Sequence, residues 1–313
     1  MALSIRRIVV GQSVKRYVNR DGEKKTRVIY KFVYTKNGKK ISSHCVDGMK
    51  VPPAGLYAKI SDDPEKDKVW AMWTDEKGRE QRLYSKSHRQ NAHASKYDRL
   101  ERVAQLIPRI KTALVADSES MYAERREMST ILLIILETGL RIGSNLDTKG
   151  EVEAFGVSTL LSRHVKIAPG GVRLEFVGKK GVINRAFVKS SLVASLLRNR
   201  KSPAYTTPLF NISGSKCLAY LKEIAGWDEI KIKDLRTWRA SIEASKWIEK
   251  RKGPAPTEKV FRQWQREVGD KVSKILCNTR PVVINSYINP KLWATWRKPE
   301  WGEWIPKSLK SDD

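Results

Sequence analysis

Apolar and polar residues alternate over short stretches in the first 90 residues, and residues that favour turns separate these stretches. Four segments rich in β-branched and aromatic residues carry the alternation: Arg27–Tyr34, Lys40–Val46, Val51–Ile60 and Lys68–Trp73. The dipeptide Asn37-Gly38 between the first two is a strong hairpin signal. We therefore predict a small β-rich domain over residues 1–90.

The apolar spacing becomes helical from Lys96 onward, after a polar segment, 85–95, that we interpret as a linker. The first helical pattern runs from Tyr97 to Ile107 and stops before Pro108. Further helices are predicted over Glu127–Glu137, Ser191–Asn199, Gly214–Ala225, Asp234–Lys252 and Thr257–Cys277. These patterns predict a mainly α-helical domain over residues 91–313.

Alternation returns between Val172 and Val188, around a turn at Gly178–Gly181, which predicts a β-hairpin inside the helical domain. Gly139, Gly226 and Gly253 follow predicted helices and are expected to close them. The Trp-rich segment Trp293–Trp304 is predicted to pack as a cap or arm. The expected fold class is α+β, with a β-rich N-terminal domain and a larger helical one.

The composition adds a strong charge signal, because 61 Lys and Arg stand against 34 Asp and Glu, a formal net charge of +27. Such an excess predicts a polyanionic partner without specifying any chemistry. The three cysteines and four histidines are scattered, so we expect neither a disulfide framework nor a metal site. The longest apolar run, Ile131–Leu136, is too short for a membrane span, and the N-terminus lacks a signal-peptide pattern. An intracellular protein without a metal or cofactor is expected.

The candidate chemistry centres on Leu276–Pro290, which contains Asn278, Pro281 and Tyr287. Asn278 and Tyr287 are out of phase on one continuous helix, but Pro281 predicts a break that folds the tyrosine back beside the asparagine. A tyrosine presented in this way, in so basic a protein, fits a nucleophile aimed at a phosphate.

Three upstream cations complete a set that suits attack on a phosphodiester. Arg141 follows a helix-ending glycine, Lys179 lies at the tip of the predicted hairpin, and Arg236 stands three positions after Lys233. Arginines grip phosphate oxygens and stay charged, and a lysine can protonate a leaving oxygen. Lys233 and Arg236 lie on one helical face, near a start that Asp234 can cap.

Each residue taken alone also has an ordinary structural explanation. An isolated arginine in so basic a chain is usually a solvated surface charge, and a buried tyrosine usually serves packing. Lys179 at a hairpin tip fits a turn residue, and Lys180 beside it blurs the assignment. Asn278 fits a helix C-terminus. The order of the set, Arg, Lys, Arg, polar residue and Tyr, favours the joint hypothesis.

Together with these residues, several motifs in order resemble those of type IB DNA topoisomerases, particularly the compact poxvirus-like and bacterial form. The motifs are VPPAGLYAKI at Val51–Ile60, KYDRL at Lys96–Leu100, FGVSTLLSRHV at Phe155–Val165, FVGKKG at Phe176–Gly181, KDLRTW at Lys233–Trp238 and LCNT with SYI between Leu276 and Ile288. The resemblance extends over nearly the whole chain. It implies a clamp of two domains that closes round duplex DNA as a monomer and needs neither ATP nor metal.

The resemblance also implies roles for individual residues. Tyr287 corresponds to the nucleophile of a 3′-phosphotyrosyl link, Arg141 and Arg236 to the phosphate-binding arginines, and Lys179 to the general acid of the hairpin. Asn278 stands where many members carry His, as a donor to a phosphate oxygen. Residues expected to contact DNA are Lys233, Tyr57, Lys59, Lys96 and Tyr97. Ser144 departs from the Asn that often follows the R-x-G motif.

Two other functions fit part of this pattern. A tyrosine recombinase or integrase shares the Arg, Lys, Arg and Tyr chemistry, but it usually carries H-x-x-R where this chain has Lys233 and Arg236. A non-catalytic nucleic-acid-binding module explains the charge and the aromatic content, but it does not explain the ordered set of catalytic residue types.

Overall fold

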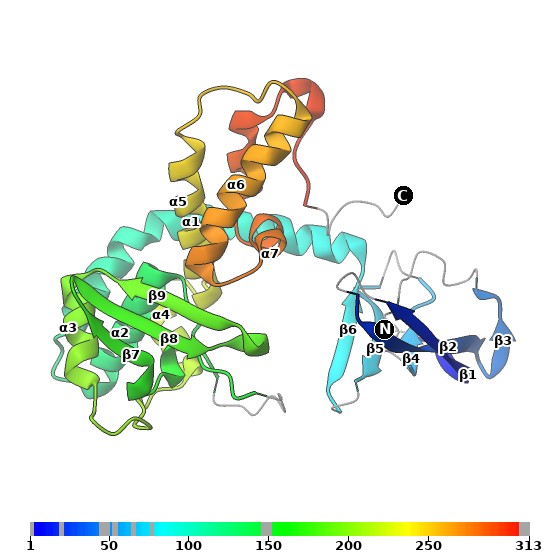
Figure 1. Ribbon diagram of the computed structural model, residues 1–313, viewed down its shortest axis with the longest axis horizontal. Coiled ribbons are helices and arrows are strands. Elements are labelled where there is room, and N and C mark those ends of the chain that lie inside the picture. Colours follow the sequence, from blue (N-terminus) through cyan, green and yellow to red (C-terminus); the bar gives the residue numbers. More distant parts are fainter. Residues whose placement is uncertain are drawn as a thin grey trace. The chain divides into compact units, whose positions relative to one another are not determined.

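The computed structural model describes residues 3–18, 22–43, 51, 56–63, 67–75, 78–144 and 152–306. The chain divides into two compact units, with the boundary between Ala94 and Ser95. Figure 1 shows a β-rich N-terminal unit and a mainly helical second unit. The predicted α+β fold class is therefore confirmed.

The N-terminal unit is a six-stranded sheet in the order β3-β2-β1-β4-β5-β6, and every neighbouring pair is antiparallel. The strands are β1 (Ile5–Val18), β2 (Lys24–Lys36), β3 (Lys39–Ile41), β4 (Ala58–Ile60), β5 (Val69–Thr74) and β6 (Glu80–Tyr84). The predicted Asn37-Gly38 turn joins β2 and β3, with φ angles of 51° and 76° in the left-handed region that such turns need. Parts of the predicted strands Lys40–Val46 and Val51–Ile60 lie outside the described residues.

Helix α1 (Lys86–Asp117) differs from the prediction at both ends. The segment interpreted as a linker is helical from Lys86, since it holds no Gly or Pro and the Ser85 hydroxyl accepts a hydrogen bond from the His88 amide at 3.3 Å. The helix also continues through Pro108, because the buried side chains of Ile110 and Leu114, C-terminal to the proline, keep it packed. Tertiary packing here outweighs the lost backbone donor.

The second unit contains α2 (Ala123–Thr138), α3 (Ser191–Arg200), α4 (Gly214–Ala225), α5 (Ile232–Ile248), α6 (Glu258–Leu276) and α7 (Arg280–Ser286). Gly139 and Gly226 close α2 and α4 in left-handed conformations, as predicted. Gly253 does not close α5, which ends at Ile248 where the apolar spacing stops. The predicted hairpin is present as β8 (Gly171–Val177) and β9 (Ile183–Val188), but an additional strand, β7 (Val165–Ala168), makes it a three-stranded sheet.

Two apolar cores position the candidate site. In the first, the buried run Ile131–Leu136 of α2 packs among the sheet β7-β8-β9 and helices α1, α3 and α4. In the second, α5, α6 and α7 enclose Trp293 and Trp296, both fully buried. The Trp-rich segment, predicted to pack as a cap or arm, thus packs into the second core, and α5 links the two cores.

Candidate active site

Arg236 is the most deeply buried cation of the predicted set, with 2 % of its surface exposed. Its guanidinium donates to the Leu276 carbonyl at 2.7 Å and to the Gly139 carbonyl. These two carbonyls end helices α6 and α2, so one side chain joins two helix C-termini, where cations are favoured. Arg236 is therefore not the solvated surface charge that its type alone predicts.

Arg141 lies in the loop after α2, and the segment that follows Phe155-Gly156 holds the backbone of this loop. The Val157 amide donates to the Arg141 carbonyl at 2.9 Å, and the Ser158 amide donates to the Ile142 carbonyl at 2.6 Å. Gly156 approaches this loop so closely that a Cβ atom there would lie 2.4 Å from the Gly143 Cα. Because Gly156 has no side chain, the two backbone segments can approach this closely, and this approach sets the position of the Arg141 loop.

Tyr287 stands at the C-terminal end of α7, and the Arg236 guanidinium lies 5.0 Å from the centre of its ring. Burial raises the pKa of the phenol, but the charges of Arg236 and Arg141, together with hydrogen bonds from both side chains, outweigh it and leave the pKa below the ordinary value of 10.0. The structure therefore brings Arg141, Arg236 and Tyr287 together. A phenol easier to ionise is a better nucleophile at neutral pH.

Asn278 lies just beyond α6, two residues after the Leu276 carbonyl that binds Arg236. Its Oδ1 atom accepts from the Thr279 amide at 2.9 Å, while its Nδ2 atom is buried and has no partner among the described residues. A buried amide donor without a partner is costly unless a ligand satisfies it. Cys277 before it has a φ angle of 47° and exchanges hydrogen bonds with the Arg185 backbone on β9.

Lys179 and Lys233 are both exposed. Lys179 lies in the short 3-10 turn Lys179–Gly181 between β8 and β9. No contact within the described part of the chain joins it to Arg141, Arg236 or Tyr287. Lys233 lies in the first turn of α5, where Asp234 accepts from the Lys231 amide at 3.0 Å and caps the helix as expected. The structure therefore leaves the role of Lys179 a prediction.

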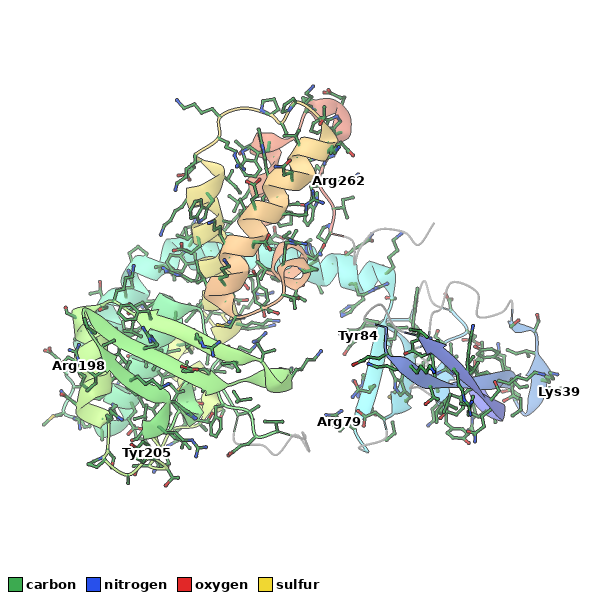
Figure 2. The ribbon with its side chains drawn as sticks, viewed as in Figure 1. Lys39, Arg79, Tyr84, Arg198, Tyr205 and Arg262 are labelled. Carbon is green, nitrogen blue, oxygen red and sulfur yellow. The ribbon has the colours of Figure 1, made fainter. Side chains whose placement is uncertain are left out.

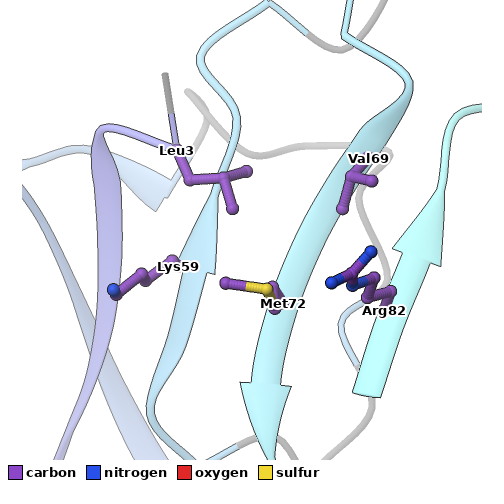
Figure 3. A pocket seen from close by; sticks show the side chains of 5 residues that line it. All are labelled: Leu3, Lys59, Val69, Met72 and Arg82. Atoms are coloured by element: carbon purple, nitrogen blue, oxygen red, sulfur yellow. The ribbon is translucent and has the colours of Figure 1, made fainter. Parts of the chain in front are cut away.

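The residues predicted to bind DNA fall into two groups. Tyr57 and Lys59 are exposed in the N-terminal unit, where Lys59 and Arg82 border a pocket with Leu3, Val69 and Met72 (Figure 3).

Lys96 and Tyr97 instead contact the segment that carries Tyr287. Tyr97 is 4 % exposed and its hydroxyl donates to the Ile288 carbonyl at 3.0 Å, while Lys96 donates to the Ser286 carbonyl. Contact with DNA by either residue stays a prediction.

Sequence reasoning missed residues that hold the backbone and the helices around the candidate site. Ser241 on α5 donates to the Tyr287 carbonyl at 3.3 Å, and Arg99 on α1 pairs with Asp234 at 3.3 Å. A serine inside a helical pattern carries no distinguishing signal, whereas the Gly in the FG motif does. Within the described ranges, no group of three or more His, Cys, Asp or Glu is placed to hold a metal ion, and no helix has the length and apolar character needed to cross a membrane.

The sequence family described as the catalytic core of eukaryotic DNA topoisomerase I matches residues 85–292, a span that includes Arg141, Arg236, Asn278 and Tyr287. This chain belongs to that topoisomerase family. The chain is 27 % identical over 211 residues to DNA topoisomerase 1B of Acanthamoeba polyphaga mimivirus, covering 63 % of this chain and 62 % of the relative. It is 31 % identical over 173 residues to DNA topoisomerase 1B of vaccinia virus, covering 53 % and 52 %.

A third relative is DNA topoisomerase 1 beta of Arabidopsis thaliana, 25 % identical over 210 residues that make up 65 % of this chain and 22 % of the plant protein. The resemblance to the poxvirus-like type IB topoisomerases is thereby confirmed. The chain spans about half to three-fifths of the length of the viral topoisomerases that it matches.

Proposed function

We propose that this chain is a type IB DNA topoisomerase that relaxes supercoiled duplex DNA. Tyr287 cleaves one strand and forms a 3′-phosphotyrosyl link, the free 5′ end swivels, and the link is then reversed. The observation that supports this proposal most directly is the convergence of the buried Arg236 and of Arg141 on one phenol whose pKa they lower.

Cleavage is a transesterification in which the bonds balance. The Tyr287 oxygen attacks the phosphorus and loses its proton to solvent, the bond from phosphorus to the 5′-oxygen breaks, and that oxygen gains a proton. Since one phosphodiester replaces another, the bond energy is retained for religation, and the step needs neither ATP nor a metal. The reverse reaction, attack by the 5′-hydroxyl, restores the strand.

Charge on the two non-bridging oxygens grows in the transition state, and preorganised donors stabilise it. Arg236 is held in place by two carbonyls, so little reorganisation is needed when the phosphate arrives. Arg141 comes from a loop pinned by Gly156 and Val157. The Nδ2 atom of Asn278, which has no partner within the described ranges, supplies a further hydrogen bond to a phosphate oxygen.

Lys179 is proposed as the acid that protonates the leaving 5′-oxygen, with Lys233 assisting it or contacting the phosphate. Both amines are exposed, so each is open to a bound duplex. Lys233 also lies close enough to Lys96 for their charges to interact. This assignment rests on the order of motifs and on the position of Lys179 at the hairpin tip.

Duplex DNA is the proposed partner of both units, bound by a monomer inside the cell or virion wherever DNA is present. Exposed cations occur throughout the chain, and Lys39, Arg79, Arg198 and Arg262 lie at the periphery of their units (Figure 2). Such contacts are to phosphates and carry no sequence information, so binding is expected to weaken steeply with salt.

Relaxation of negatively supercoiled plasmid, in EDTA and without ATP, tests the proposal. Wild type and a control, Tyr205→Phe at a tyrosine that is 73 % exposed, are expected to relax the plasmid, whereas Tyr287→Phe is not. Relaxation by Tyr287→Phe would refute the nucleophile assignment. If no variant relaxes the plasmid although all bind it, the topoisomerase proposal fails and recombination substrates are tested next.

A further inference from the structure

Three consecutive backbone carbonyls, those of residues 286–288, lie at the candidate nucleophile, and each accepts a hydrogen bond from a side chain of helix α1 or α5. Lys96 donates to the Ser286 carbonyl, Ser241 to the Tyr287 carbonyl at 3.3 Å, and Tyr97 to the Ile288 carbonyl at 3.0 Å. Ser241 also accepts from the Asn289 amide at 3.1 Å. Helices α1 and α5 thus grip the chain on both sides of Tyr287.

The position of Tyr287 at the end of α7 explains why such contacts are needed. The last carbonyls of a helix have no partner within it, and the chain after it is free to fray. Helix α7 is only seven residues long and is marginal by itself. The Lys96 ammonium at the helix C-terminus and the Tyr97 hydroxyl supply the missing donors.

The contacts of α1 are built into the core. Tyr97 is 4 % exposed, Ile288 is fully buried, and the Lys96 ammonium lies 4.3 Å from the centre of the Tyr97 ring. One turn further, the ion pair between the half-buried Arg99 and the buried Asp234 fixes α1 against the start of α5, the helix that carries Arg236. Helices α1 and α5 therefore hold both the backbone at Tyr287 and Arg236, the arginine that faces its phenol.

We propose that Lys96, Tyr97 and Ser241 are positioning residues, which set the approach of the Tyr287 hydroxyl to the phosphorus by holding the backbone of residues 286–288. This inference rests on the proposed role of Tyr287 as nucleophile. It assigns Lys96 and Tyr97 a function other than contact with DNA. Because transesterification requires in-line geometry, a small shift of this backbone lowers the cleavage rate without changing how the DNA is bound.

Tyr97→Phe removes one hydroxyl and leaves the ring packed, so the hydrogen bond to the Ile288 carbonyl is lost together with the one that this hydroxyl accepts from Lys96 Nζ at 3.1 Å. A matched control is Tyr220→Phe on α4, because Tyr220 is also buried, at 2 % exposure, and its hydroxyl donates to Asp117 at 2.6 Å away from the site. Ser241→Ala tests the second contact. Each variant is compared with wild type for thermal stability, duplex affinity and single-turnover cleavage of a duplex whose cleaved strand cannot be religated.

Tyr97→Phe and Ser241→Ala are expected to cleave about 10-fold to 100-fold more slowly at unchanged duplex affinity. Tyr220→Phe is expected to lose a similar amount of thermal stability and to cleave at the wild-type rate. The proposal is overturned if Tyr97→Phe and Ser241→Ala cleave like Tyr220→Phe, with only stability reduced. Wild type forming no covalent adduct at Tyr287 would instead overturn the proposed function, so the two failures are distinguishable.

Discussion

Gly156→Ala is the sharpest perturbation of the Arg141 loop that the structure offers. Gly156 has an extended backbone, φ −145° and ψ −174°, that alanine also adopts, so the substitution introduces no backbone strain of its own. Its effect comes from the added methyl group. That group would lie 2.4 Å from the Gly143 Cα and N atoms and 2.8 Å from the Arg141 carbonyl oxygen.

Ordinary contacts of a Cβ atom begin at 3.4 Å, and the crowded atoms all belong to the backbone. The Arg141 loop must therefore retreat by about 1 Å, a misplacement that typically costs about 100-fold in rate. Overpacking of this kind also lowers the free energy of unfolding by about 1–3 kcal/mol. We expect cleavage to fall by about two orders of magnitude in a protein that still folds.

Single-turnover cleavage at saturating protein measures the chemical step, and thermal unfolding measures the stability. The control is Gly11→Ala on β1, where the nearest atom to an added Cβ, on Lys31, lies 3.9 Å away. Gly11→Ala is expected to leave both quantities near wild type. Cleavage by Gly156→Ala at the wild-type rate would refute the claim that this glycine positions Arg141.

Three further predictions concern Arg236, Asn278 and His164. Arg236→Lys keeps the charge but cannot reach both the Gly139 and Leu276 carbonyls, so single-turnover cleavage should fall about 100-fold or more while duplex affinity holds; an unchanged rate would contradict this. Asn278→Ala removes an amide donor that has no partner in the part of the chain that the structure describes, and the same assay should show a loss of about 10-fold to 100-fold that Asn278→His restores; no loss would exclude a role for this amide. Burial, then the charge of Arg163, lowers the pKa of His164 from 6.5 to about 4. Because the unfolded chain then binds a proton more readily than the folded one, the free energy of unfolding should fall by on the order of 1–3 kcal/mol as the pH is lowered from 6.5 to about 4. Denaturant unfolding at several pH values should show a smaller loss of unfolding free energy at low pH for His164→Gln than for wild type. An equal loss would refute His164 as its source.

Much of the local structure was predictable because short-range rules decide it. Gly139 and Gly226 close helices in left-handed conformations, and Asn37-Gly38 makes its hairpin, since these positions require φ angles that few residues adopt. The start of α1 was missed because a polar segment without Gly or Pro reads as a linker, although it forms a helix once its C-terminal half packs.

The candidate site was predictable as a set of residue types and not as a geometry. Sequence order proposed Arg141, Arg236 and Tyr287, but the burial of Arg236 depends on α2 and α6 ending at the same place. The hydrogen bond from Tyr97 to the Ile288 carbonyl joins residues 191 positions apart, and no sequence-spacing rule predicts a contact at that separation. The Lys179 side chain is exposed, so its part in the reaction depends on a bound duplex.

The central claim is that Tyr287 forms a covalent link to a cleaved DNA strand, and mapping that link tests it most directly. The protein is incubated with a labelled duplex in EDTA without ATP, denatured, digested with protease, and the peptide attached to DNA is identified by mass spectrometry. We expect a 3′-phosphoryl end joined to Tyr287 and no adduct from Tyr287→Phe. A link to a 5′ end, a link to another residue, or plasmid relaxation without any adduct would contradict it.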